Sequence, residues 1–217
     1  MAIENKDIAA IREDYSKGAL SENDTLENPF EQFQLWFNQA LASNVLEPNA
    51  MVLSTINEEG FPSSRVVLLK DIKGDGFSFF TNYTSQKGRD IARHAKVSLL
   101  FFWGELQRQV RIEGTVDFLA QEDSDEYFAS RPKGSQIGAW SSPQSQIIPD
   151  RDYLENRVKE KEEEFVDLAV VARPPFWGGY LVKPVRIEFW QGRSSRLHDR
   201  IVYTKGVDAW SKDRLAP

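Results

Sequence analysis

The sequence predicts a predominantly β-structured protein with flanking helices. Between residues 50 and 118, short apolar runs alternate with turn signals such as those around Gly60 and Gly76. Runs of this length and spacing are typical of antiparallel strands. Helical patterns lie on both sides of this region, and the strand pattern returns after Pro174 and Pro175. Strands spaced in this way usually close into a barrel or a sandwich.

The individual elements can be assigned in chain order. An amphipathic helix is expected first, at 29–43, because Phe30, Phe33 and Phe37 recur at near-helical spacing. Neither an internal repeat nor a low-complexity linker interrupts the chain, so we expect a single domain over 1–217. The remaining expected elements are strands at 51–56, 65–69 and 77–81, a short helix at 86–95, strands at 97–103 and 109–118, helices at 121–130 and 151–167 (the second a charged surface helix), and strands at 177–190 and 197–203.

The composition excludes several kinds of chemistry. The chain has no cysteine, which rules out disulfides, thiolate nucleophiles, iron–sulfur clusters and cysteine zinc sites. Any redox chemistry must therefore come from a bound organic cofactor. The two histidines, His94 and His198, lie far apart and neither has a partner at ligand spacing, so no metal site is expected.

The charge distribution limits the possible partners. A formal net charge of -6 argues against nucleic-acid binding. No stretch approaches the roughly 18 apolar residues that a membrane span requires, and the N-terminus lacks a targeting pattern, so we expect a cytoplasmic protein without membrane contact. Residues 171–217 carry nine Lys and Arg against four Asp and Glu. This local excess suggests an anionic ligand.

Arg196, His198 and Arg200 alternate along an expected strand. Alternate residues of a strand share a face, so these three side chains are predicted to crowd together. Like charges on one face destabilise a sheet unless something anionic or electron-rich lies against them. A ligand accounts for the pattern, and the alternative is a solvated basic edge strand that deters aggregation.

Further cations lie near the ends of other predicted strands. Arg65 and Lys70 bracket one apolar run, and Lys87 follows the next strand. Such groups suit a phosphate without any glycine loop, although ordinary strand-end charges remain the alternative. Neither a G-x-G-x-x-G fingerprint nor a Walker loop is present, which disfavours a dinucleotide fold or a P-loop enzyme.

Two polar groups complete the candidate site. Tyr127 and Arg131 stand four residues apart on an expected helix face, with Ser135 just beyond, and together they also suit a phosphate. The alternative is a helix end with a half-buried tyrosine. Gln109 lies on a polar strand face and can bond the edge of a flavin ring, or it is simply a sheet-surface glutamine.

Taken together, these motifs resemble the pyridoxine 5′-phosphate oxidase family from residue 11 to the C-terminus. The motifs are Arg65-Val-Val-Leu-Leu-Lys70, Phe79-Phe-Thr-Asn82, Ser130-Arg-Pro-Lys-Gly-Ser-Gln-Ile-Gly-Ala-Trp140, Phe176-Trp-Gly-Gly179, Glu188-Phe-Trp-Gln-Gly192 and Arg196-Leu-His-Asp-Arg200. The resemblance implies an FMN-binding split β-barrel and a homodimer with two FMN at the subunit interface. It also implies oxidation of pyridoxine 5′-phosphate or pyridoxamine 5′-phosphate to pyridoxal 5′-phosphate, with O2 as acceptor and H2O2 as product.

The resemblance also assigns residues to the ligands, with 1–28 as a segment that covers the substrate. One departure is Gln86, where the family often has an arginine, which puts a flavin-phosphate contact there in doubt. The FMN residues are Arg65, Val66, Val67, Leu68, Leu69, Lys70, Phe80, Thr81, Lys87, Gln109, Gln144, Ser145, Trp190 and Arg200. The substrate residues are Arg12, Glu13, Asp14, Tyr15, Lys70, Tyr127, Arg131, Ser135, Arg196, Leu197 and His198.

Arg196 and His198 are the expected catalytic residues. Arg196 stays charged and can stabilise negative charge on the substrate, and a neutral His198 is expected to accept a hydrogen bond or proton from the C4′ substituent. One alternative is a split-barrel protein that binds flavin or a vitamin B6 phosphate without catalysis, against which the intact Arg196-Leu-His198 argues. Another is a nucleic-acid-binding module, which a steep dependence of binding on salt would reveal.

Overall fold

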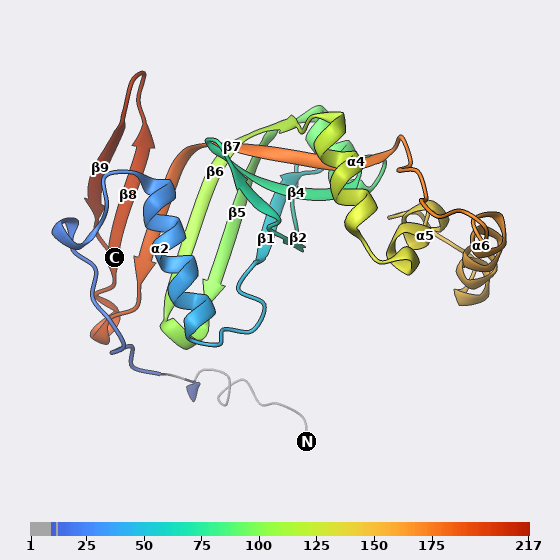
Figure 1. The fold of residues 1–217 in the computed structure, drawn as a ribbon. Helices are drawn as coiled ribbons and strands as arrows, with labels where there is room; N and C mark the ends of the chain where they lie inside the picture. The colour runs from blue at the N-terminus through green and yellow to red at the C-terminus, as the bar shows by residue number, and fades with distance from the viewer. Residues whose placement is uncertain (1–9, 12) are drawn as a thin grey trace. The chain divides into compact units, whose positions relative to one another are not determined.

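A computed structural model describes residues 10–11 and 13–217 of the chain (Figure 1). The chain forms two compact units. Unit 1 contains the described residues up to Pro48 together with Leu100–Ile112 and Arg186–Pro217, and unit 2 contains Asn49–Leu99 and Glu113–Val185. Three strands run through both units, namely β5 (Lys96–Trp103), β6 (Arg108–Phe118) and β7 (Trp177–Gln191).

The described residues form a nine-stranded sheet with the order β2-β1-β5-β6-β7-β4-β3, and β8 pairs with β7 and β9. The remaining strands are β1 (Ala50–Ile56), β2 (Pro62–Leu68), β3 (Asp71–Lys73), β4 (Gly76–Asn82), β8 (Asp199–Lys205) and β9 (Trp210–Leu215). The pairs β1–β2, β3–β4, β4–β7, β7–β8 and β8–β9 are antiparallel. The predicted β-rich architecture with flanking helices is therefore confirmed.

Unit 1 is built around helix α2 (Pro29–Ala42) and an aromatic core. The helix begins where the Asn28 side chain accepts a hydrogen bond from the Phe30 backbone N–H at 2.8 Å, a common way to satisfy a free helix-end donor. Its inward face buries Phe33 and Trp36. The Phe33 ring lies 5.0 Å from the Phe101 ring and the Trp36 ring 5.2 Å from the Phe189 ring. The predicted amphipathic helix is thus confirmed, with its aromatics in the core.

The two ends of the described chain meet within unit 1, where the blue segment before α2 lies beside the red strands β8 and β9 (Figure 1). Tyr203 Oη donates to the Leu26 carbonyl at 2.6 Å. Arg214 donates to both carboxylate oxygens of Glu22 at 2.7 and 2.9 Å, and also to Asp199. These bonds attach the N-terminal segment to the C-terminal hairpin.

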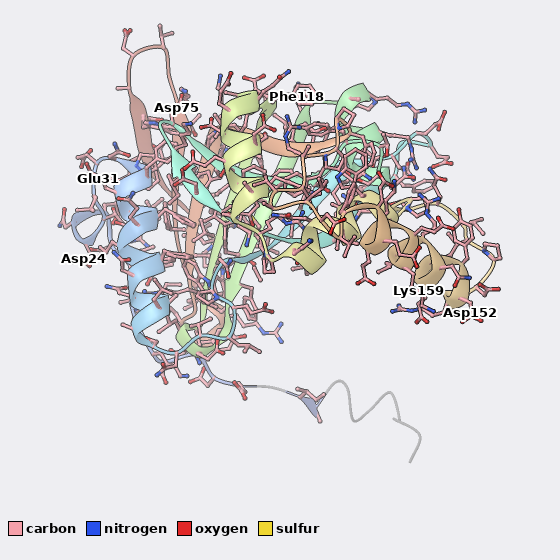
Figure 2. The ribbon with its side chains drawn as sticks, turned by 45° about the vertical axis from the view of Figure 1, so that its right-hand side comes forward. Asp24, Glu31, Asp75, Phe118, Asp152 and Lys159 are labelled. Atoms are coloured by element: carbon pink, nitrogen blue, oxygen red, sulfur yellow. The ribbon has the colours of Figure 1, made fainter. Side chains whose placement is uncertain are left out.

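Unit 2 contains helices α3 (Gln86–Arg93), α4 (Gln121–Ser130), α5 (Lys133–Ser141) and α6 (Arg151–Glu164). A hydrophobic cluster joins the last three helices to the start of β7, and its buried members are Phe128, Ile137, Phe165, Val171 and Trp177. Helix α6 buries no residue, and Figure 2 shows Asp152 and Lys159 on it. The expected charged surface helix is confirmed.

Apart from short 3₁₀ helices, three described elements were not predicted: β3, β9 and α5. β3 is only three residues long, and α5 contains two glycines and two serines, which weaken the propensity signal for a helix. The last predicted strand begins at Asp199 and not at 197. No helix among residues 10–11 and 13–217 combines the length and apolar character needed to cross a bilayer.

Gly88 lies in the first turn of α3, where an added Cβ would approach the Tyr83 carbonyl oxygen to 2.0 Å. We expect Gly88→Ala to lower the free energy of unfolding by about 1–3 kcal/mol, as overpacking does elsewhere, measured by urea denaturation. Gly134→Ala is the matched control, because a Cβ at Gly134 in α5 meets nothing within 4 Å. Equal stability of the two variants would contradict this account of the α3 start.

Candidate ligand-binding site

A cavity of about 670 Å³ opens in unit 2, within the size range of small-molecule sites. Its walls come from the end of β2, the end of β4, the start of α3, and the segment from α4 to just beyond α5. Many of the residues assigned to FMN or substrate line it: Val66, Val67, Leu68, Lys70, Phe80, Thr81, Lys87, Tyr127, Arg131, Ser135 and Gln144.

A first group of cations lies at the junction of β2 and α3. The Lys87 ammonium lines the cavity and donates to Thr81 Oγ1 and Ser85 Oγ, both at 3.3 Å. Burial lowers the pKa of Lys87, and the nearby positive charge of Arg65 lowers it further. Burial also lowers the pKa of Arg65, against the opposing effect of Asp90. Hydroxyl groups do not neutralise this paired positive charge, so the site favours an anion.

A second cationic group centres on Arg131. Its Nη1 atom is buried and has no hydrogen-bond partner among the described residues. The guanidinium lies 4.6 Å from the Trp177 ring centroid and 5.4 Å from that of Phe128, and burial lowers its pKa. A buried, unsatisfied charged donor is costly, so this atom points to an anionic acceptor that a ligand supplies.

Aromatic rings form the wall beside Arg131. Phe80 stacks on Tyr127 at 4.0 Å and on Trp177 at 5.6 Å, with interplanar angles of 19° and 13°. The Lys70 ammonium lies 5.8 Å from the Tyr127 ring centroid. Lys70, Tyr127, Arg131 and Ser135 therefore share the cavity.

The prediction that Tyr127 and Arg131 share one helix face, with Ser135 just beyond, is wrong for the helix. Helix α4 ends at Ser130, Arg131 is extended with ψ 148°, and Ser135 lies on α5. The physical reason is Pro132, because the residue before a proline is disfavoured in the helical region. The break between the two helices still leaves all three side chains on the same cavity.

Six residues assigned to FMN do not line the cavity. Gln109, Trp190 and Arg200 belong to unit 1, and Leu69, Ser145 and Arg65 belong to unit 2. Leu69 is 6% exposed and belongs to the core. Ser145 is exposed and has a positive φ of 69°. Arg65 is not among the lining residues, and its guanidinium donates to Leu53, Thr55 and Ser63.

A second cavity lies in unit 1, with Glu13, Asp14, Tyr15, Arg196 and His198 among its lining residues. Arg12 falls outside the described residues. The rings of Trp190 and His198 lie 4.6 Å apart, and the Tyr15 ring is 5.9 Å from each of them. The unit therefore brings the expected substrate segment to the expected catalytic residues.

The prediction that Arg196, His198 and Arg200 share one strand face is wrong. Arg196 ends the 3₁₀ helix η3 (Ser194–Arg196), with Ser195 and Arg196 at φ values of 56° and 61°. His198 lies between η3 and β8. Arg200 donates to both carboxylate oxygens of Glu188 at 2.9 and 3.1 Å. Two successive left-handed residues interrupt the extended backbone, so the period-2 pattern does not apply.

The backbone also fixes the hydrogen-bonding role of His198. The Arg193 N–H donates to His198 Nδ1 at 3.1 Å, so Nδ1 is the acceptor nitrogen of the ring. In a neutral imidazole the proton then resides on Nε2, which becomes a donor. In that tautomer Nε2 cannot accept the hydrogen bond or proton expected from the C4′ substituent, and the role of His198 toward the substrate stays a prediction.

The remaining predicted residues also belong to unit 1. Gln109 and Trp190 are half-buried on β6 and β7, and Leu197 is 69% exposed. Among the residues that the structure describes, no group of three or more His, Asp or Glu side chains is arranged to hold a metal ion.

Sequence reasoning missed two polar residues that organise these cavities. Gln107 accepts from the Ser16 and Lys17 N–H groups at 3.0 and 3.1 Å and so holds the segment that carries Tyr15. Nothing in its sequence context marks it. Asp90, fully buried on α3, lies four residues after Gln86, and that i,i+4 spacing was an available signal.

Comparisons with known proteins identify relatives over the whole chain. The family model described as pyridoxamine 5′-phosphate oxidase matches residues 37–163, and the model described as the pyridoxine 5′-phosphate oxidase C-terminal dimerisation region matches 177–217. The pyridoxine/pyridoxamine 5′-phosphate oxidase of Burkholderia multivorans is 53% identical, covering 97% of this chain and 99% of the relative. That of Cyanothece sp. is 50% identical, covering 97% and 98%.

Solved structures share the fold. PhzG from Burkholderia lata, in complex with tetrahydrophenazine-1-carboxylic acid, superposes with a TM-score of 0.85 at 30% identity, covering 92% of this chain and 98% of PhzG. A pyridoxamine 5′-phosphate oxidase-related, FMN-binding protein from Nostoc punctiforme has a TM-score of 0.67 at 15% identity, covering 85% and 97%. The predicted split-barrel fold class is thereby confirmed.

Lys87 offers a test of the first cationic group. Inorganic phosphate at about 100 times its Kd should stabilise the parent by about 2.7 kcal/mol, and Lys87→Met should lose most of this effect in a thermal unfolding assay. Without phosphate the variant should be at least as stable as the parent, because it removes a desolvated charge. Lys159→Met, on the exposed face of α6 (Figure 2), is the control.

The pH dependence follows from the lowered pKa of Lys87. Below that pKa the buried charge costs stability, and the cost disappears as pH rises toward the ordinary lysine value, since the unfolded state then binds more protons. The parent should therefore gain stability relative to Lys87→Met over that alkaline interval. If inorganic phosphate stabilised Lys87→Met as much as it stabilises the parent, the assignment of Lys87 to an anion site would be contradicted.

Proposed function

This chain belongs to the pyridoxamine 5′-phosphate oxidase family, and we propose that it is an FMN-dependent oxidase. Its substrates are pyridoxine 5′-phosphate and pyridoxamine 5′-phosphate, its product is pyridoxal 5′-phosphate, and O2 is reduced to H2O2. The enzyme works as a homodimer, a proposal supported by the match of 177–217 to a dimerisation region.

The observation that carries the proposal is the unpartnered Nη1 of Arg131. Lys70, Tyr127 and Ser135 line the same cavity and add one cation and two hydroxyl donors. This set matches a phosphate monoester, which offers several acceptor oxygens and a double negative charge. A 5′-phosphate on the substrate therefore satisfies the group that the protein leaves unsatisfied.

The first cationic group fits the phosphate of FMN. Lys87 and Arg65 supply the charge, and Thr81 and Ser85 hold the Lys87 ammonium in place. Gln144 and Val66 to Leu68 line the same cavity and provide backbone and side-chain contacts. When bound, FMN supplies the acceptor for the hydride that leaves the C4′ carbon of the substrate.

Arg196 and His198 act on the substrate in this proposal. Arg196 holds a permanent positive charge and stabilises negative charge that develops on the substrate. His198 directs its Nε2–H toward a substrate oxygen, because its Nδ1 is engaged by the Arg193 N–H. It thus serves as a hydrogen-bond donor that aligns the substrate. Proton removal from the substrate is left to solvent.

A second candidate function comes from the likeness to PhzG, whose structure contains tetrahydrophenazine-1-carboxylic acid. A carboxylated tricyclic substrate carries one negative charge and no phosphate. It would leave the donors around Arg131 less completely satisfied than a phosphate does. The relatives at 50–53% identity also favour the vitamin B6 phosphates. A third candidate is a protein that binds these ligands without oxidising them.

The substrate prediction is tested by anaerobic reduction of the FMN-loaded protein, followed by absorbance. Pyridoxine 5′-phosphate should reduce bound flavin much faster than unphosphorylated pyridoxine. Arg131→Met should lower the apparent second-order rate constant for the phosphorylated substrate by roughly 10- to 150-fold, the value of a charged hydrogen bond. The rate with pyridoxine should change little.

Arg151→Met is the control, since Arg151 is an exposed arginine on α6. If the protein binds no FMN, it is not a flavoenzyme. If it binds FMN but no vitamin B6 phosphate reduces the flavin, only the third candidate, a protein that binds without oxidising, remains. Faster reduction by tetrahydrophenazine-1-carboxylic acid would establish the second candidate.

The role of His198 is tested by comparing two substitutions in single-turnover flavin reduction. His198→Gln keeps an N–H donor near the position of Nε2, so its rate should stay within about threefold of the parent. His198→Ala and Arg196→Leu should lose roughly 5- to 150-fold with FMN still bound, as expected for lost contacts of about 1–3 kcal/mol. A loss in His198→Gln as large as that in His198→Ala would show that His198 takes a proton.

A further inference from the structure

Asp90 is a buried acid next to the first cationic group. It lies on α3 and is 0% exposed. Its Oδ1 accepts from Gln86 Nε2 at 2.7 Å, and its Oδ2 accepts from Thr55 Oγ1 at 2.7 Å. A carboxylate this deeply buried requires both hydrogen bonds and a nearby positive charge. Arg65 provides that charge, with its Nη2 at 3.8 Å from Oδ2.

Thr55 connects Asp90 to Arg65. The hydroxyl of Thr55 has one proton, and the Asp90 carboxylate at 2.7 Å is a nearer acceptor than the Ser63 carbonyl at 3.4 Å. The lone pairs of the hydroxyl therefore face Arg65 Nη1, which donates to it at 2.7 Å. Asp90 thus sets the direction of the whole chain of hydrogen bonds, from the guanidinium through the hydroxyl to the carboxylate.

Arg65 is held on one side by these contacts. Its Nη1 also donates to the Leu53 carbonyl at 3.3 Å, and its Nη2 donates to Ser63 Oγ at 2.6 Å. A guanidinium has five N–H donors, and these bonds account for three of them. The described residues supply no hydrogen-bond acceptor for the remaining donors, so an anion beside Lys87 can accept from them.

The same network explains Gln86, the position at which this chain departs from the family pattern. Its Nε2 is bonded to Asp90, and its Oε1 accepts from Arg89 Nη2 at 2.9 Å. Gln86 is not among the residues that line the cavity. One end of the amide therefore orients Asp90, and the other end is bonded to Arg89.

We propose that Asp90 is a positioning residue for the flavin phosphate, acting through Thr55 and Arg65, with Gln86 fixing its second oxygen. The inference rests on the proposed function. Asp90 holds the Arg65 guanidinium in one orientation beside Lys87 and offsets the repulsion between these two cations before the phosphate arrives. The cation pair is then preorganised, and binding does not require the arginine to be ordered.

Two opposing effects make the proposal testable. Coulomb attraction alone predicts that removing the negative charge of Asp90 strengthens binding of a phosphate dianion. Disruption of the hydrogen bonds around Asp90 predicts weaker binding of the phosphate. In Asp90→Asn the new side chain must present an N–H to either Thr55 or Gln86, where the carboxylate only accepts. Since the Gln86 oxygen is already used by Arg89, one donor of the network loses its acceptor.

The experiment measures Kd for FMN and for riboflavin, which lacks the phosphate, by quenching of flavin fluorescence in the full-length protein. We expect Asp90→Asn to weaken FMN binding about tenfold, which corresponds to about 1.4 kcal/mol. Riboflavin affinity should stay within about twofold of the parent. Thr55→Val should give the same FMN-specific loss, and the double variant should lose little more than either single variant, since both cut the same chain.

Ser54→Ala is the matched control, because Ser54 bonds Ser64 between the same two strands at an exposed position. Tighter FMN binding in Asp90→Asn would overturn the proposal and show that Coulomb attraction to the phosphate dominates. Equal losses of affinity for FMN and riboflavin would show that Asp90 supports the fold and does not position the phosphate. If Asp90→Asn does not fold, Thr55→Val decides the question. If the parent protein binds no FMN, the proposed function is refuted. If the parent binds FMN and oxidises its substrate, but the variants bind FMN as tightly as the parent, only this inference is refuted.

Discussion

Partly buried positive charge that neutral groups leave largely unbalanced is the constraint on which unit 2 depends. Burial lowers the pKa of Lys87, Arg65 and Arg131, and their surroundings are largely hydroxyls, carbonyls and ring faces. Such groups hold a cation in place but do not neutralise it. The unit therefore carries an electrostatic cost in the absence of ligand, and an anion that enters the cavity removes this cost. The stability of the unit and its ligand preference have the same origin.

The topology converts this constraint into a site with defined geometry. The antiparallel pair β1–β2 places Leu53 opposite Arg65 and Thr55 opposite Ser63, so acceptors for the arginine come from both strands. Helix α3 follows β4 after a short turn capped by Ser85, which brings Lys87 to the same place. The break between α4 and α5 adds Arg131 from a distant part of the sequence. Regular backbone thus supports side chains that by themselves repel each other.

Unit 1 illustrates a different principle, in which backbone groups determine side-chain chemistry. The left-handed residues Ser195 and Arg196 fold the chain back, so that the Arg193 N–H reaches His198. This single bond engages Nδ1 as an acceptor, and in the neutral ring Nε2 then carries the proton. Gln107 and the Glu22–Arg214 ion pair hold the N-terminal segment across the same unit. The chemistry of the unit therefore depends on loops whose conformations side-chain patterns do not reveal.

The sequence alone determined the helices and strands whose apolar periodicity extends over one long continuous segment. The helix at 121–130, the strand from Trp177 and the charged helix from Arg151 follow directly from periodicity and turn signals. The residue types indicated the cations of the cavity lining, and the family resemblance added further lining residues. The tertiary structure alone decided that Arg131 is extended, that Arg200 pairs with Glu188, that His198 Nδ1 accepts from the Arg193 N–H, and that Gln86 bonds Asp90. Each of these depends on a partner distant in sequence or on a backbone angle with a low intrinsic preference. Periodicity reports which face a residue occupies, whereas hydrogen-bond direction and charge pairing depend on the neighbours that folding brings to that face.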